Sequence, residues 1–330
     1  MFVTKLCKLH KSGFKILKQK IIFWIEDYLF FPNYFQKILS YLLLPLSFLY
    51  IFIIFIKRVT SSKIDFGIPI ISIGNLTVGG SGKTPITIEL AKNIKDVCVI
   101  LRGYGRASKG LFVVSLNGKI KVDVNISGDE AMLLATSLKN ATVIVSEDRV
   151  LGIKKAKELG SKVIFLDDGF SKYSIKKFDI LLKPKDEPTN NFCIPSGAYR
   201  EPKSFYKKAN LVLKEGIDFK REVEIKKDGE KSELPEKTVL LTAISKPKRL
   251  LEFLPKNIET IFFEDHHTFT KDEIDTILEK YREFGIVTTQ KDFVKLEKFH
   301  LKNIYIMDLK IKLSEKLDLK ELNSYLNTNG

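Results

Sequence analysis

The 330-residue sequence contains only three cysteines and four histidines. Cys7, Cys98 and Cys193 lie far apart, and none of them belongs to a CxxC pair or to a cluster of cysteines and histidines. Because a disulfide framework needs paired cysteines and a zinc site needs closely spaced ligands, we expect neither here. Cys98 lies within the apolar run VCVIL, which predicts a small residue of the core.

Acidic residues are also in the minority. The chain has 55 Lys and Arg against 40 Asp and Glu, a net charge of +15. This excess favours an anionic partner such as a membrane surface, a phosphorylated substrate or nucleic acid, although a lysine-rich surface alone could produce it. Nucleic-acid binding would need lysines and aromatics interleaved on one face of the folded domain, and the densest such mixture lies near the N-terminus beside an apolar stretch. We therefore predict no nucleic-acid partner.

No charged residue occurs between Lys37 and Lys57, where the chain reads ILSYLLLPLSFLYIFIIFI. As a helix this stretch would reach about 28 Å, barely enough to cross a bilayer, and Pro45 would kink it. With Trp24, Tyr28 and several lysines before it, a shallow or re-entrant helix on the cytoplasmic leaflet fits as well as a crossing. A buried hairpin is a further alternative. A signal peptide is not expected, because the apolar region starts far from the first residue and no small-residue cleavage site follows.

The most informative motif is GNLTVGGSGKTP, from Gly74 to Pro85. It follows the apolar run IPIISI and precedes ITIELAKNI, whose apolar residues have helical spacing, which predicts strand, glycine-rich loop and helix. Backbone N–H groups and the helix N-terminus would then converge on phosphate, with Lys83 reaching the β- and γ-phosphates and Thr84 binding Mg²⁺. Thr77 replaces the first glycine of a strict P-loop, so a turn without a nucleotide role stays open. The predicted nucleotide-binding residues are Thr77, Val78, Gly79, Gly80, Ser81, Gly82, Lys83 and Thr84.

Two acidic pairs follow predicted strands or open helices. Asp167 and Asp168 come directly after KVIFL, at the strand end where open α/β sheets bind ligands, and they suit Mg²⁺ as the Walker-B acid does. Asp129 and Glu130 open an amphipathic helix in SGDE. Helix capping alone accounts for this second pair, but Asp129 could also accept the proton of an attacking hydroxyl group.

Histidines and arginines add further candidates. His266 and His267 follow an apolar strand in FFEDHHTF, where an imidazole beside an aspartate could transfer a proton or bind a metal. Arg149, Arg200 and the arginines of LRGYGR occupy loops after predicted strands and could clamp phosphates, although each could equally be an ordinary surface charge. TTQKD resembles a guanine-reading motif only loosely, so no GTPase is predicted.

The remaining chain alternates short β-branched runs with amphipathic stretches, which predicts a P-loop NTPase-like α/β fold with a mostly parallel sheet and helices on both faces. Asn117-Gly118 predicts a hairpin, and Thr270 with Glu273 predicts a capping box. We predict a membrane-associated helical segment at 1–61, a nucleotide-binding domain at 62–215, a charged linker or exposed ribbon at 216–237, and a smaller α/β domain at 238–330.

Taken in order, GNLTVGGSGKTP, LRGYGR, GDE, LDDGF, PSGAYREP, EDHHTF and VTTQKDFVKL resemble the tetraacyldisaccharide 4′-kinases of lipid A synthesis. The resemblance runs from about Leu42 to Leu296. It implies transfer of the ATP γ-phosphate, with Mg²⁺, to the 4′-hydroxyl of a tetraacylated glucosamine disaccharide 1-phosphate at the cytoplasmic face of the inner membrane. It also implies a catalytic set of Asp129, His266 and Asp168, substrate or phosphate contacts at Glu130, Arg149, Arg200 and His267, and metal ligands at Thr84, Asp167 and Asp168.

The chain departs from the family pattern at two places. Ser171 stands where glutamine is usual, and Ala198 and Tyr199 stand where proline and leucine are usual. The partners predicted are the acylated lipid substrate and inner-membrane lipids, with no obligate protein partner. The alternative function is a membrane-associated P-loop ATPase that drives a partner, which would release phosphate from ATP rather than leave it on a lipid.

Overall fold

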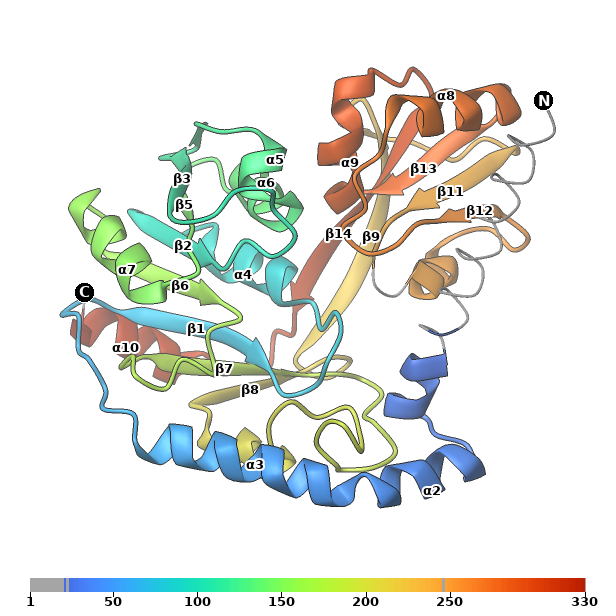
Figure 1. Ribbon diagram of the computed structural model, residues 1–330. Helices are drawn as coiled ribbons and strands as arrows, with labels where there is room; N and C mark the ends of the chain where they lie inside the picture. The colour runs from blue at the N-terminus through green and yellow to red at the C-terminus, as the bar shows by residue number, and fades with distance from the viewer. Residues whose placement is uncertain (1–20, 22–23, 245–246, 330) are drawn as a thin grey trace. The chain divides into compact units, whose positions relative to one another are not determined.

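The computed structural model describes residues 21, 24–244 and 247–329, so Cys7 and the N-terminal lysines lie outside the described residues. Two compact units are present. The first consists of Met1–Ser61, Leu76–Val78 and Pro184–Lys208, and the second of Ser62–Asn75, Gly79–Lys183 and Ala209–Gly330. The fold is mixed α/β, with two large sheets that both lie in the second unit (Figure 1).

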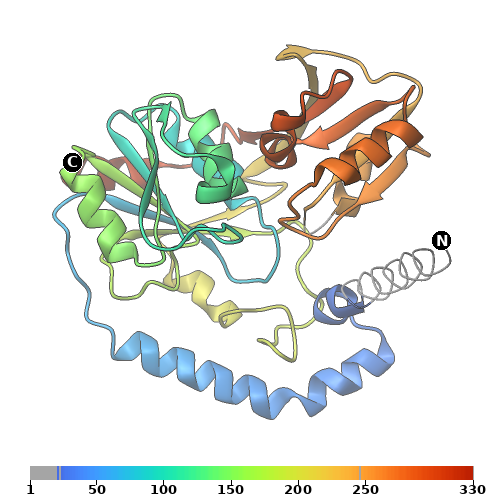
Figure 2. The same cartoon turned by 45° about the horizontal axis from the view of Figure 1, so that its top comes forward.

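The first unit contains two consecutive helices, α2 (Tyr34–Leu42) and α3 (Leu44–Val59), bent by 54° with respect to each other. Pro45 lies in the first turn of α3, so the predicted kink is confirmed, and Figure 2 shows the bend clearly. Among the described residues, no single helix is both long enough and apolar enough to span a membrane. The bent pair taken together is long and apolar enough, judged by length and composition alone. Large apolar side chains on both helices are exposed, including Phe35 at 78% and Leu42 at 72%, so the buried-hairpin alternative is wrong for this segment.

One polar face ties α3 to the rest of its unit. The Ser47 hydroxyl donates to the Cys193 carbonyl oxygen at 2.9 Å and also contacts the Ser196 hydroxyl at 2.8 Å. Tyr50 donates to the Arg200 carbonyl oxygen at 2.8 Å. The short helix η1 (Lys203–Lys208) follows this segment. Because Ser47 is buried, these hydrogen bonds hold α3 on the loop between residues 184 and 208.

The first sheet has eight strands in the order β4-β3-β5-β2-β6-β1-β7-β8. The six strands from β5 to β8 in this order are parallel, and β3 pairs antiparallel with both β5 and β4. The turn between β3 and β4 has positive φ at Asn117 and Gly118, which confirms the predicted hairpin. The strands are β1 (Ile70–Asn75), β2 (Val97–Leu101), β3 (Phe112–Leu116), β4 (Lys119–Ile120), β5 (Thr142–Val145), β6 (Val163–Asp167), β7 (Phe178–Lys183) and β8 (Leu211–Lys214).

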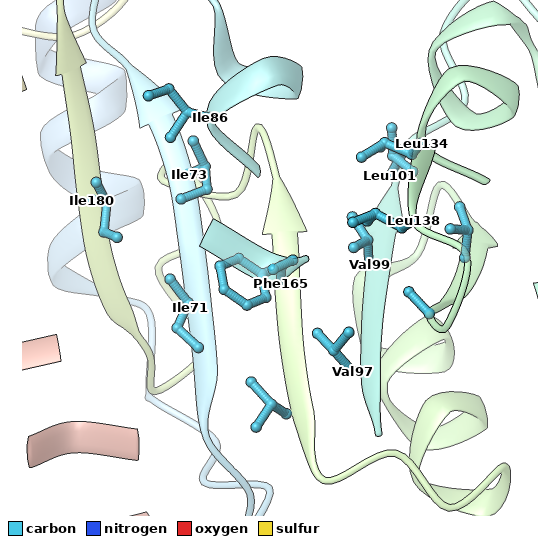
Figure 3. Packing of buried hydrophobic residues seen from close by; sticks show 14 of the residues in the cluster. Ile71, Ile73, Ile86, Val97, Val99, Leu101, Leu134, Leu138, Phe165 and Ile180 are labelled. Atoms are coloured by element: carbon cyan, nitrogen blue, oxygen red, sulfur yellow. The ribbon is translucent and has the colours of Figure 1, made fainter. Parts of the chain in front are cut away.

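Alternate residues of these strands supply two cores. Ile71, Val99 and Phe165 pack with Leu134 of α6 and with residues of α4 and α10. Figure 3 shows this packing for α6 and α4. On the opposite face, neighbouring strand residues pack against α7. The strands are thus buried on both faces, as predicted from their continuous apolar runs. The helices are α4 (Lys83–Ala91), α5 (Val124–Ser127), α6 (Asp129–Ser137), α7 (Arg149–Glu158) and α10 (Lys320–Asn329).

The second sheet has six strands in the order β10-β9-β14-β13-β11-β12. Helix α8 covers one face (Figure 2), and its capping box between Thr270 and Glu273 is confirmed. The charged segment 216–237 contains β9 and β10, which pair with β14 and with each other. The elements are β9 (Phe219–Lys227), β10 (Glu230–Lys231), β11 (Thr238–Thr242), η2 (Pro247–Phe253), β12 (Glu259–Phe262), α8 (Lys271–Lys280), β13 (Gly285–Thr289), α9 (Gln290–Leu296), η3 (Glu297–Phe299) and β14 (Ile304–Leu313).

Strands β9 and β14 form a long antiparallel ribbon, whose side chains pack in the hydrophobic cores of both sheets. They pair from Ile306 opposite Lys226 to Leu313 opposite Phe219. Met307 packs in the core of the second sheet, whereas Phe219 and Ile311 pack in the core of the first. The ribbon therefore joins the two sheets within one unit.

Candidate active site

The glycine-rich loop leads from β1 to α4, the succession predicted from its sequence. Gly82 precedes the helix with a φ of 83°, a conformation that favours glycine. A side chain there would also be crowded, because a Cβ atom would lie 3.1 Å from Arg221 Nη2. Arg249 of η2 donates to the Gly80 carbonyl oxygen at 3.1 Å. Lys83, the first residue of α4, lies 3.2 Å from Asn75 Oδ1 and 3.7 Å from Asp168 Oδ1.

The first residues of the loop pair with the segment PSGAYREP inside the first unit. The Val78 N–H donates to the Ala198 carbonyl oxygen at 2.8 Å, and the Arg200 N–H donates to the Leu76 carbonyl oxygen at 2.7 Å. Tyr199 is fully buried beside them. Thr77, Val78 and Arg200 are thus placed together by backbone pairing, and Tyr199 fills the position where the family pattern has leucine.

Asp167 ends strand β6 with its side chain buried. Its Oδ2 accepts from the Thr84 hydroxyl at 3.4 Å, and its Oδ1 has no hydrogen-bond partner among the described residues. Burial, followed by repulsion from Glu130, raises the pKa of Asp167 to about 7. Arg149 donates to the Asp167 carbonyl oxygen at 3.1 Å and to the Ser146 carbonyl oxygen at 2.6 Å, so its guanidinium braces the strand end behind the carboxylate.

This arrangement fits a magnesium ion. The described residues contain no group of three or more His, Cys, Asp or Glu side chains able to hold a metal by themselves. Mg²⁺ at kinase sites is instead held by one or two protein oxygens together with substrate phosphates. The unpartnered oxygen of Asp167 and the hydroxyl of Thr84 are donors of that kind, and a cation would relieve the cost of keeping this buried carboxylate charged.

Asp129 and His266 form a close pair although 137 residues separate them in the sequence. Asp129 is the first residue of α6 and is 4% exposed. His266 follows β12 and has a φ of 61°. Its backbone N–H donates to the Ala243 carbonyl oxygen at 3.2 Å, which helps to hold this conformation. His266 Nδ1 lies 3.0 and 3.1 Å from the two carboxylate oxygens of Asp129. An imidazole in this position can take up a proton while the carboxylate stabilises its charge.

The electrostatics of the pair favour a charged carboxylate. Burial alone would raise the pKa of Asp129, but its hydrogen bond with His266 and the charges of Lys291 and Lys295 lower that pKa to about 2. Burial would lower the pKa of His266, but the hydrogen bond and charge of Asp129 raise it above 6.5 overall. The carboxylate is therefore ionised, and the proton between the two side chains lies on Nδ1 of the imidazole, which leaves Nε2 as the nitrogen that can accept a proton.

Three of the surrounding groups were not identified as site residues from the sequence. Lys291 Nζ lies 3.4 Å from Glu130 and 3.4 Å from Asp265, and Lys295 Nζ lies 3.4 Å from Asp129. The Tyr104 ring meets the His266 ring edge to face at 5.2 Å. The motifs VTTQKDFVKL and LRGYGR contain all three residues. The four-residue spacing of the two lysines, which places them on one face of α9, was the available signal.

Two residues predicted as site candidates, His267 and Arg106, contact groups other than Asp129 and the glycine-rich loop. His267 Nε2 lies 2.9 Å from Glu273, and its ring stacks on Phe263 at 4.5 Å. Arg106 of LRGYGR pairs with Glu147 at 2.5 Å. The structure therefore couples His266, rather than His267, to Asp129.

Comparison with known proteins gives a consistent result. Residues 39–327 match the family model described as tetraacyldisaccharide-1-P 4′-kinase, LpxK. The tetraacyldisaccharide 4′-kinase of Aliarcobacter butzleri is 70% identical over 312 residues, covering 94% of this chain and 99% of the relative. That of Campylobacter jejuni subsp. jejuni serotype O:2 is 47% identical over 294 residues, covering 89% and 93%. A crystal structure described as the "apo" form of LpxK from Aquifex aeolicus in complex with ATP is similar at a TM-score of 0.71 and 30% identity, covering 88% of this chain and 99% of that one.

Proposed function

We propose a role in phosphoryl transfer for each site residue of this chain, which belongs to the tetraacyldisaccharide-1-P 4′-kinase family and is therefore a kinase of lipid A synthesis. The reaction moves the γ-phosphoryl group of ATP to the 4′-hydroxyl of a tetraacylated glucosamine disaccharide 1-phosphate and uses ATP and Mg²⁺. Phosphoryl transfer of this kind depends on placement and charge neutralisation more than on covalent chemistry.

The glycine loop holds the triphosphate, from Thr77 to Thr84. The position of Lys83 between Asn75 and Asp168 at the start of α4 supports a role at the β- and γ-phosphates. Thr84 and Asp167, with Asp168 beside them, would hold Mg²⁺, which supplies positive charge next to the phosphate oxygens. Arg149 and Arg200 are proposed phosphate contacts, with Arg149 in addition bracing Asp167.

Asp129 and His266 act together as the general base. The substrate hydroxyl must lose its proton as it attacks the γ-phosphorus atom, and a hydrogen-bonded carboxylate and imidazole can accept it as a unit. The observation that carries this assignment is the 3.0 Å contact between His266 Nδ1 and the Asp129 carboxylate. Glu130 and His267 are proposed to contact the substrate.

The lipid substrate implies a membrane-facing part of the chain. We assign this role to residues 1–61, because α2 and α3 expose Phe35, Phe48 and Phe52, and Lys57 and Arg58 follow in the last turn of α3. Apolar side chains next to basic ones suit the interface of an anionic membrane. The proposed location is the inner membrane, with the active site on its cytoplasmic side.

The sheets are proposed to serve different parts of the reaction. The segment 62–215 would form the P-loop nucleotide-binding domain, 238–330 a smaller α/β domain that supplies His266, and 216–237 the linker or exposed ribbon that connects them in the sequence. This division agrees with the chemistry of each sheet, since the glycine loop belongs to the first and the EDHH segment follows a strand of the second.

A radiolabel experiment tests the function. The purified protein is incubated with γ-labelled ATP, Mg²⁺ and tetraacyldisaccharide 1-phosphate in detergent. We expect label in the chloroform-soluble disaccharide, in proportion to ATP consumed. Label that appears only as free phosphate would support the alternative, an ATPase that drives a partner.

A further inference from the structure

A buried carboxylate, Asp292, lies at the start of α9 and is 0% exposed. Its Oδ2 accepts from the Thr242 hydroxyl at 2.6 Å, from the Thr289 hydroxyl at 2.8 Å and from the Ala243 N–H at 3.1 Å. Three donors on one oxygen fix the orientation of this side chain. Its other oxygen, Oδ1, faces Lys295 Nζ at 3.0 Å.

Lys295 lies one helical turn after Lys291 and is also buried. Its ammonium group lies between two carboxylates, Oδ1 of Asp292 at 3.0 Å and Oδ2 of Asp129 at 3.4 Å, and above the Phe269 ring at 5.5 Å. A buried cation is costly unless opposite charges compensate it. The position of Lys295 is therefore defined by these two carboxylates, one of which belongs to the pair with His266.

The other charged neighbours of the Asp129–His266 pair also contact carboxylates outside the pair. Lys291 lies 3.9 Å from Asp129 but 3.4 Å from both Glu130 and Asp265, and it is more exposed than Lys295. His266 is faced by Asp129, by Asp265 at 3.7 Å and by the Tyr104 ring. Of the two lysines, only Lys295 lies between Asp129 and Asp292, a fully buried carboxylate.

Asp292 also supports the histidine. Its Oδ2 accepts from the Ala243 N–H, and the Ala243 carbonyl oxygen accepts from the His266 N–H at 3.2 Å. The buried carboxylate of Asp292 is thus linked to Asp129 by the ammonium group of Lys295, and to the backbone of His266 by the hydrogen bonds of Ala243. Asp129 belongs to α6, and His266 follows β12, so this arrangement fixes two separate segments against each other.

We propose that Lys295, held in place by Asp292, is a positioning residue of the phosphoryl transfer, which orients the Asp129 carboxylate toward His266. The inference rests on the proposed function, because it assigns Lys295 a role through the pair that accepts the substrate proton.

The test compares Lys295→Met with Lys298→Met. Methionine keeps the length and apolar packing of lysine but removes the charge, and Lys298 is an exposed lysine that also lies over a phenyl ring, at 4.9 Å. We expect Lys295→Met to lower kcat about 10- to 100-fold, with KM for ATP changed by less than about twofold. Lys298→Met should match the unaltered protein, and Lys295→Arg should recover much of the lost kcat because it restores the charge.

An independent readout needs no substrate. In the ligand-free protein, the Nδ1–H proton of His266 gives a downfield NMR signal while it is bonded to Asp129, and its loss in Asp129→Asn assigns it. Lys295→Met should shift that signal upfield or lose it by exchange. If both kcat and the signal survive, or kcat falls while the signal stays, Lys295 does not act through the pair and the inference is overturned.

Two further outcomes are covered by the same design. If Lys295→Met does not fold, Asp292→Asn takes its place, since it keeps the side-chain shape and removes the charge that holds Lys295, and the same two readouts decide. If the unaltered protein fails to phosphorylate the lipid, the proposed function fails, whereas the His266 signal still decides whether Lys295 orients the pair.

Discussion

Replacement of Asp129 by asparagine should separate chemistry from nucleotide binding. The change keeps the size of the side chain but removes the charge that His266 Nδ1 contacts at 3.0 Å. We expect kcat for lipid phosphorylation to fall by about 10²- to 10⁴-fold, the usual contribution of a general base. ATP affinity should change little, because Asp129 lies outside the glycine loop.

The same variant should also lose stability, by an amount that follows from the structure. The pKa of Asp129 lies at about 2 against an ordinary 3.8, so its ionised form stabilises the fold by about 2 kcal/mol near neutral pH. The sign follows from the lowered pKa: this stability is present above the unfolded pKa and is lost as pH falls toward about 2. An asparagine side chain cannot ionise, so the Asp129→Asn protein lacks the contribution near neutral pH.

Single-turnover transfer of labelled phosphate, ATP titration and urea unfolding measure these three effects. Asp275→Asn, at an exposed position of α8, is the matched control and should leave all three unchanged. An Asp129→Asn protein with an intact kcat would refute the assigned base. A loss of kcat accompanied by an equal loss of ATP affinity would place Asp129 in nucleotide binding instead.

Three further outcomes are expected. The acid limb of kcat should fall about tenfold per pH unit below the raised pKa of His266, because an imidazole protonated on both ring nitrogens accepts no further proton; a profile flat from about pH 5 to 8 would contradict this. Lys83→Ala should weaken ATP binding and lower kcat together, which isothermal titration and initial rates would show, and unchanged ATP affinity would argue against the phosphate role of the loop. Deletion of residues before about Ser61 should reduce sedimentation with membranes while ATP binding stays measurable; retention of the truncated protein after a carbonate wash would count against this segment as the membrane contact.

Local patterns of the sequence predicted local structure well. The strand, loop and helix around residues 74–85 follow from glycines and apolar spacing within a short stretch of chain. The hairpin at Asn117-Gly118 and the bend near Pro45 follow from backbone restrictions of single residues, which packing does not override. The alternation of β-branched runs with amphipathic stretches was sufficient for a mostly parallel sheet.

Long-range contacts of the site could not be predicted in this way. Asp129 and His266 were brought together only by the resemblance to a family, since nothing in either motif specifies a partner 137 residues away. Lys295 and Asp292 depend on how α9 packs beside α6, a tertiary arrangement with no signature in local spacing. The pairing of His267 with Glu273 has no local signature either, because the capping box of α8 already accounts for that glutamate.

The β9–β14 ribbon has a consequence for the evolution of the chain. Side chains alternate between the two faces of a strand, so a single inserted or deleted residue would turn every later side chain to the opposite face. Met307 near one end and Ile311 near the other are each committed to a different core, and Phe219 anchors the opposing strand. Relatives should therefore tolerate length changes at the β9–β10 turn near Asp228 but not inside the ribbon itself.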